Sequence, residues 1–149
     1  MKSSPRELDW SIGDTAARFG LETHVLRHWE DRGLLRPARD PAGRRRYTHA
    51  DVVRVATVVR SKAAGMSLEQ ILVLLDADAP GRHEVLGAHL ADLDRRMDDM
   101  VRSRAMTEHA LRCRAHDIAA CPRFSAILDD LVTGQRGTFP SPHAGQHAH

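Results

Sequence analysis

The chain has 149 residues and a formal net charge of +2, with 22 lysine and arginine residues against 20 aspartate and glutamate residues. Its length suits one domain, or a small head with an extension, and the scarcity of aromatic residues predicts an aliphatic core. No apolar run approaches the ~20 residues of a membrane span, and the first residues do not read as a signal peptide. We therefore expect a cytoplasmic protein that does not enter a membrane.

The charge is distributed unevenly along the chain. Residues 1–66 hold 13 basic and 8 acidic side chains, whereas residues 67–149 hold 9 and 12. A basic front half favours a polyanionic partner, because phosphate neutralisation releases counterions. Only two of the 22 basic residues are lysine, so a coding bias towards arginine would explain the charge equally well. The order of the motifs has to decide between these interpretations.

The front half begins with two predicted helices. Ser11 is placed to cap the first helix, and Gly20 is placed to end it. A second helix is expected over residues 23–32, with Trp29 on its inward face and Gly33 as its stop. Two short helices joined at such a corner are typical of a helix-turn-helix.

A small wing and two further helices are expected next. Residues 34–37 and 45–47 are predicted as short strands around residues 40–43, whose composition favours a turn. Thr48 and Ser67 each begin a sequence typical of a capping box, and an apolar helical pattern follows each of them. Together these elements predict a winged helix-turn-helix head.

A long helix with a heptad seam is predicted over residues 82–112. The apolar seam steps by four and three residues through Leu86, Leu90, Leu93, Met97 and Met100, and the spacing continues through Arg104, Thr107 and Leu111. Because charged residues flank it, the stripe is narrow and suits pairing with a second identical helix. The alternative is packing onto the head of the same chain, but a helix of about 30 residues spans ~45 Å and exceeds a small head. We therefore favour a homodimer.

Five sequence blocks occur together in the order of a known family. They are Ile12-Gly13-Asp14-x-Ala16, Gly20-Leu21, Leu26-Arg27-His28-Trp29-Glu30-x-x-Gly33-Leu34, Arg45-Arg46-Tyr47 and Gly65-Met66-Ser67-Leu68-Glu69. In these blocks the chain resembles the MerR family of bacterial transcription regulators. The resemblance implies a mainly α fold: a winged helix-turn-helix head, a long antiparallel coiled-coil dimerisation helix, and a short C-terminal effector loop and helix.

The resemblance also implies a division of the chain and a way of acting. The expected parts are an N-terminal extension (1–10), the DNA-binding head (11–78), the dimerisation helix (82–112), the effector loop and terminal helix (113–132) and a disordered tail (133–149). Regulators of this family bind promoter DNA as homodimers, then bend and untwist it so that RNA polymerase meets both promoter elements. Phosphate contacts on both flanks recover the deformation energy.

Individual DNA contacts follow from the same resemblance. Arg27 matches a phosphate-contacting arginine on the recognition helix, and Arg45 and Tyr47 match the wing contacts. Thr23 and His24 stand where that helix faces base edges, so we expect them to read sequence.

Cys113 and Cys121 form a C-x7-C pair just after the long helix. The pair is similar to the cation-binding cysteines of the metal-sensing branch, most of all to the copper-responsive members. Two thiolates suit a soft monovalent ion such as Cu(I), and both must lose a proton to bind it. Residues 78–83 lack the further cysteine of zinc- and mercury-type members. His83 or His116 could replace that cysteine, and either would favour a borderline ion.

Other interpretations of the cysteines stay open. They could be buried thiols that help a terminal helix over residues 124–132 to fold onto the long helix, or they could form a disulfide under oxidant. The chain would then be a regulator of the same fold with redox sensing or no effector. A metal chaperone or store would use the same thiols and ignore DNA. Phosphate loops and hydrolase motifs do not occur in the sequence, so we do not expect an enzyme.

The tail offers a weaker signal. His143, His147 and His149 lie in a stretch rich in glycine, proline and serine, which favours a disordered end with incidental histidines over a metal-collecting tail. The C-terminal part is too short for a domain that would enclose a bulky organic effector.

Overall fold

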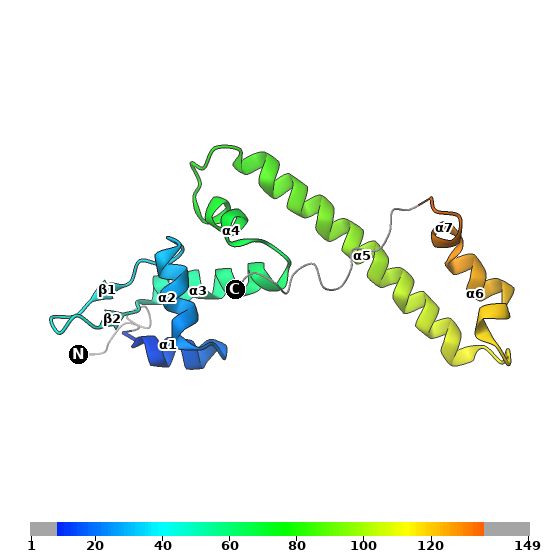
Figure 1. Ribbon diagram of the computed structural model, residues 1–149, viewed down its shortest axis with the longest axis horizontal. Coiled ribbons are helices and arrows are strands. Elements are labelled where there is room, and N and C mark those ends of the chain that lie inside the picture. The colour runs from blue at the N-terminus through cyan, green and yellow to red at the C-terminus, as the bar shows by residue number, and fades with distance from the viewer. Residues whose placement is uncertain (1–8, 136–149) are drawn as a thin grey trace. The chain divides into compact units, whose positions relative to one another are not determined.

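The computed structural model describes residues 9–135 (Figure 1). The elements in chain order are α1 (Ile12–Phe19), α2 (Thr23–Asp31), β1 (Ala38–Arg39), β2 (Arg45–Arg46), α3 (His49–Ala63), α4 (Leu68–Leu75), α5 (Arg82–Arg112), the 3-10 turn η1 (Ile118–Ala120), α6 (Pro122–Ile127) and α7 (Asp129–Val132). The predicted mainly α fold with a small wing is confirmed. The N-terminal extension falls largely, and the histidines of the tail entirely, outside the described residues.

The chain divides into two compact units, Met1–His89 and Leu90–His149. The boundary falls within α5, so the first turns of this helix belong to the head and the remainder to the second unit. Among the described helices, none is both long enough and apolar enough to cross a membrane.

Helices α1, α3 and α4 begin after the capping residues that the sequence predicts, and all three starts, including the one at Ser11 where only an N-cap is expected, are full capping boxes. The hydroxyls of Ser11, Thr48 and Ser67 accept the backbone N–H three residues later at 3.0, 3.2 and 3.1 Å. The side chain of that later residue accepts the N–H of the capping residue in each case. Such caps each contribute about 1 kcal/mol because they satisfy donors that the helix leaves free. At the other end of α1, Gly20 adopts the left-handed φ of 64° that closes the helix.

The core of the head is mainly aliphatic, as the composition predicts. Its buried members are Ala16, Leu26, Trp29, Leu34, Leu35, Tyr47, Val55, Val58, Met66 and Ile71. Trp29 is 4% exposed and belongs to this core, so its predicted inward position is confirmed. Leu86 of α5 also packs against the core. The core therefore anchors the inward face of α2 through Leu26 and Trp29, and it fixes the first turns of α5 to the head through Leu86.

The wing is shorter than predicted. Strands β1 and β2 are antiparallel and pair Ala38 with Arg46 and Arg39 with Arg45. The prediction of a strand over residues 34–37 is wrong, because Leu34 and Leu35 are both buried in the core. Successive residues of a strand point to opposite faces, so two adjacent core leucines suit an irregular segment better. The Leu34 carbonyl accepts a hydrogen bond from Arg54 of α3.

The prediction of one terminal helix over residues 124–132 is also wrong. The helix breaks at Leu128, whose φ and ψ are −102° and 6°, and the two halves are α6 and α7. The half before the break carries Phe124, and the half after it carries Asp130, which forms an ion pair with Arg102 of α5. The break thus separates two short helices, α6 and α7 (Figure 1). Each has its own side-chain contact with α5.

Within the second unit, α5 has two different faces. The half-buried face carries residues that step by three and four, namely Asp99, Arg102, Met106, His109 and Cys113. On the predicted heptad seam, by contrast, Met97, Met100 and Leu111 are 65%, 70% and 83% exposed. Leu86 packs on the head core and Leu93 is half-buried, so the exposed part of the seam is Leu90, Met97, Met100 and Leu111. The contacts of α6 and α7 lie on the other face.

Candidate functional site

The outer face of α2 presents the predicted recognition residues to solvent. His24 and Arg27 are exposed, and Thr23, the first residue of the helix, is half-buried. Leu26 and Trp29 anchor the opposite face in the core. Within residues 9–135, Arg27 has no ion-pair partner, so its guanidinium is free to meet a phosphate.

The wing arginines, in contrast, all have acidic partners. Arg44 pairs with Asp40 at 3.0 Å, Arg45 with Glu30 at 2.5 Å and Arg46 with Asp9 at 2.6 Å. The hydrogen bond from Arg46 lowers the pKa of Asp9, and the backbone N–H of Arg44 lowers the pKa of Asp40. Because Glu30 belongs to α2, its contact with Arg45 joins the wing to the recognition helix. A DNA contact by Arg45 stays a prediction, and a phosphate would compete with Glu30 for this side chain.

Tyr47 lies inside the head. Its side chain is fully buried, and its hydroxyl has no hydrogen-bond partner among the described residues. Burial raises the pKa of this hydroxyl. Its backbone pairs with that of Trp10 at 2.8 and 3.0 Å, which fastens the base of the wing. The predicted contact of Tyr47 with DNA stays a prediction, and the structure gives the ring a role in packing.

Replacing Tyr47 with phenylalanine should raise the free energy of unfolding by about 1 kcal/mol, because a buried hydroxyl without a partner costs about 1–3 kcal/mol. Tyr47→Ala, which also removes the ring, should lower it by about 3–5 kcal/mol. Urea denaturation followed by circular dichroism measures both changes. A large loss of stability in Tyr47→Phe would contradict the unpartnered hydroxyl, and unchanged DNA affinity would contradict the predicted contact.

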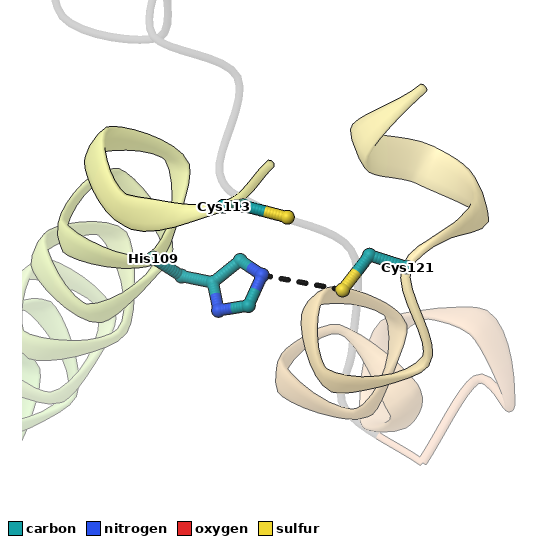
Figure 2. Close-up of side chains that lie close together, drawn as sticks. All are labelled: His109, Cys113 and Cys121. Carbon is teal, nitrogen blue, oxygen red and sulfur yellow. Dashed lines mark hydrogen bonds between the residues drawn. The ribbon is translucent and has the colours of Figure 1, made fainter. Parts of the chain in front are cut away.

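The predicted cysteines come together at the end of α5. Cys113 directly follows the helix, and Cys121 precedes α6 across the η1 turn. Both are free thiols and half-buried. His109 joins them, and the ligand atoms of all three side chains lie within 4.8 Å of one another. Figure 2 shows the imidazole ring and the two sulfurs turned towards one another.

Local contacts hold this cluster in place. The Nε2 atom of His109 lies 3.3 Å from Sγ of Cys121, and the His109 and Phe124 rings are 5.9 Å apart between centroids. The backbone N–H of Phe124 is the main cause that lowers the pKa of Cys121 to about 7, and His109, the N–H of Arg123 and Cys113 act in the same direction. Near neutral pH about half of such a thiol is the thiolate that binds metal ions, which is far more than for a thiol at the ordinary pKa.

His109 is a residue that the sequence prediction missed. The two histidines considered as further ligands, His83 and His116, are both exposed, and neither belongs to the cluster that the described residues form. The signal for His109 is its position four residues before Cys113, which places both on one face of a helix. The backbone bond from Cys113 N–H to the His109 carbonyl, at 2.8 Å, continues the helix to that point.

The amino-acid sequence of the chain is similar to those of known proteins. The family described as MerR HTH family regulatory protein matches residues 10–78, and the one described as MerR, DNA binding, matches residues 52–110. The HTH-type transcriptional regulator HmrR of Rhizobium leguminosarum bv. viciae is 30% identical over 131 residues, which are 83% of this chain and 98% of that protein. The mercuric resistance operon regulatory protein of Shigella flexneri is 34% identical over 82% of this chain and 74% of its own length.

A solved structure has the same fold. HiNmlR, described as a MerR family regulator lacking the sensor domain and bound to promoter DNA, superposes with a TM-score of 0.56. It is 22% identical to this chain, and the match covers 70% of this chain and 85% of HiNmlR.

The capped helices, the wing and the exposed face of α2 agree with these matches in sequence and fold. The protein is thus a DNA-binding transcriptional regulator and not an enzyme. The chain belongs to the MerR family of helix-turn-helix regulators.

Proposed function

We propose that this regulator acts in the cytoplasm as a homodimer that bends and untwists a promoter in response to a metal ion bound at Cys113 and Cys121. The observation that carries the proposal is the meeting of both thiols beside the last turn of α5. The distorted promoter would present its two elements to RNA polymerase together.

The exposed part of the α5 seam supports the homodimer. Leu90, Met97 and Met100 are each more than 60% exposed in the single chain and lie at heptad spacing. Apolar side chains aligned in this way suit burial against a second copy of the same helix. A dimer also supplies two heads, and two heads are needed to hold DNA on both sides of a bend.

The contacts of the terminal helices suggest how a metal signal travels. His109, Cys121 and Phe124 link α6 to α5, and the ion pair between Arg102 and Asp130 links α7 to α5. An ion that draws the two thiolates together would shift α6 and α7 against α5. A small shift at a dimer helix can become a large one at the DNA.

Two thiolates alone suit Cu(I), which is the ion that the sequence favours. One relative, from Haemophilus influenzae, is described as a probable heavy metal-dependent transcriptional regulator and is 32% identical over 74% of this chain. That description supports a metal effector and leaves its identity open.

The test uses duplexes that the purified protein selects from a randomised DNA pool, labelled at both ends for energy transfer. Anaerobic addition of Cu(I) or Zn(II) to the wild-type complex should change the end-to-end distance. Cys113→Ser/Cys121→Ser should bind the same duplex without a response to either ion. Ser103→Ala, an exposed change elsewhere on α5, is the matched control.

The possible results separate the rival functions. A response that persists in the double variant would exclude the cysteine site. Binding without a response to any cation would favour a regulator that is redox-sensing or has no effector, and an oxidant-induced response would single out the first of these. A protein that binds metal and selects no duplex would be a chaperone or store.

A further inference from the structure

His109 extends the thiol pair to a set of three donors. It lies on the last full turn of α5, one helical turn before Cys113, and its Nε2 faces Cys121 from the other side of the loop. The side chain is half-buried on the face that also carries Arg102 and Met106. Its ring is thus held between its own helix and Phe124, which limits the entropy lost when it binds a ligand.

The spacing of the donor atoms suits a compact coordination shell. In a tetrahedral zinc site, bonds of about 2.3 Å to sulfur and about 2.0 Å to nitrogen place those two atoms about 3.5 Å apart. The distance between Cys121 Sγ and His109 Nε2 is 3.3 Å, and the Cys113 sulfur lies within 4.8 Å of both. An ion placed over this triangle would reach all three atoms and would keep one position open.

The donor chemistry points the same way. Two thiolates and a neutral imidazole carry two negative charges, which cancel the charge of a divalent cation and exceed that of a monovalent one. Imidazole suits borderline ions such as Zn(II), whereas two thiolates in a line satisfy Cu(I) without it. On binding, the two thiols give up their protons to solvent and form metal–sulfur bonds, and the imidazole donates a lone pair.

We infer that His109 is a third metal ligand, which makes the site selective for a borderline divalent cation of the Zn(II) class over two-coordinate Cu(I). This inference rests on the proposed function, since it names the effector of the same cysteine site. The rival interpretation is that His109 only positions Cys121 through the observed contact. It would then affect the thiol without touching the ion.

Co(II), added anaerobically to the full-length protein as a spectroscopic probe, separates ligation from positioning. The wild type should bind one ion per chain, with thiolate charge-transfer bands and the intense visible bands of tetrahedral coordination. His109→Gln should change the visible bands and weaken Co(II) and Zn(II) binding by at least about 10-fold, and it should weaken Cu(I) binding much less. His116→Gln, which alters an exposed loop histidine, should behave as wild type.

A second measurement needs no variant. Diethylpyrocarbonate labelling of the wild type, mapped by mass spectrometry, should show that Zn(II) protects His109 and leaves His116 reactive. Equal labelling of His109 with and without Zn(II), or unchanged Co(II) bands in His109→Gln, would overturn the inference. If Cys113→Ser/Cys121→Ser still abolishes binding of Cu(I), the proposed cysteine site survives that result. Tight metal binding in the double cysteine variant would remove the site itself.

Discussion

Replacement of both Met97 and Met100 with glutamate should convert the regulator to monomers and weaken promoter binding by at least about 100-fold. The two side chains are 65% and 70% exposed in the single chain, so the substitution leaves its fold intact. In a dimer it would place four carboxylates in an apolar interface, where unpaired charge is costly. In a dimer, binding of one head holds the second head close to the DNA, and this linkage raises the overall affinity by about 10²–10⁴-fold. A monomer loses that gain.

Sedimentation equilibrium measures the oligomeric state, and gel-shift titration measures the affinity. The matched control is Ala91→Glu/Ala105→Glu, which adds the same charge at exposed positions of α5 off the seam. The control should remain dimeric and bind normally. A Met97→Glu/Met100→Glu protein that stays dimeric would place the dimer interface elsewhere.

Arg27→Ala should lower promoter affinity by about 10-fold and reduce the dependence of log K on log salt by about two units in a dimer. Each lost phosphate contact releases about one counterion fewer, and a dimer has two copies of Arg27. The side chain is exposed and has no ion-pair partner within the described residues, so its loss leaves no acidic group unpaired. Sequence preference should not change, because phosphate contacts do not read bases.

Fluorescence anisotropy at several salt concentrations provides both quantities. Arg60→Ala removes the same charge from an exposed position of α3 and should leave the salt dependence unchanged. His24→Ala should act differently, since it should relax the preference for particular bases with little change in salt dependence. An Arg27→Ala protein with wild-type affinity at every salt concentration would contradict the assignment of α2 as the DNA-contacting helix.

The local parts of the fold were predictable because local chemistry determines them. Ser11, Thr48 and Ser67 sit three residues before side chains that complete a capping box, and this pattern needs no knowledge of the tertiary structure. The heptad spacing likewise predicts both the extent of α5 and the apolar stripe whose members Leu90, Met97 and Met100 are exposed. The two wrong elements depend on packing. The local sequence around Leu34 and Leu35 is compatible with a strand, but both side chains are buried in the core, which a strand with one covered face does not allow. No residue pattern near Leu128 marks the break in the terminal helix.

The cluster of His109, Cys113 and Cys121 shows the same limit. Cys113 and Cys121 could be singled out as a pair because the residue type and spacing are unusual. His109 could not be chosen from the ten histidines of the chain by composition. Its selection depends on the helix continuing to Cys113 and on the loop returning Cys121 to the same face. The four-residue spacing suggests that His109 and Cys113 share a helix face. Only the tertiary structure shows that the loop brings Cys121 to that face.

The acidic partners of the wing arginines compete with DNA phosphates for the same guanidinium groups. Glu30, Asp40 and Asp9 already occupy Arg45, Arg44 and Arg46, so an arriving phosphate must exchange with a carboxylate or share its guanidinium. The net gain at each exchange is small, whereas Arg27 faces no such competition. A random polyanion would therefore gain little binding free energy from the wing arginines. Only a duplex whose shape engages both recognition helices at once would displace these carboxylates.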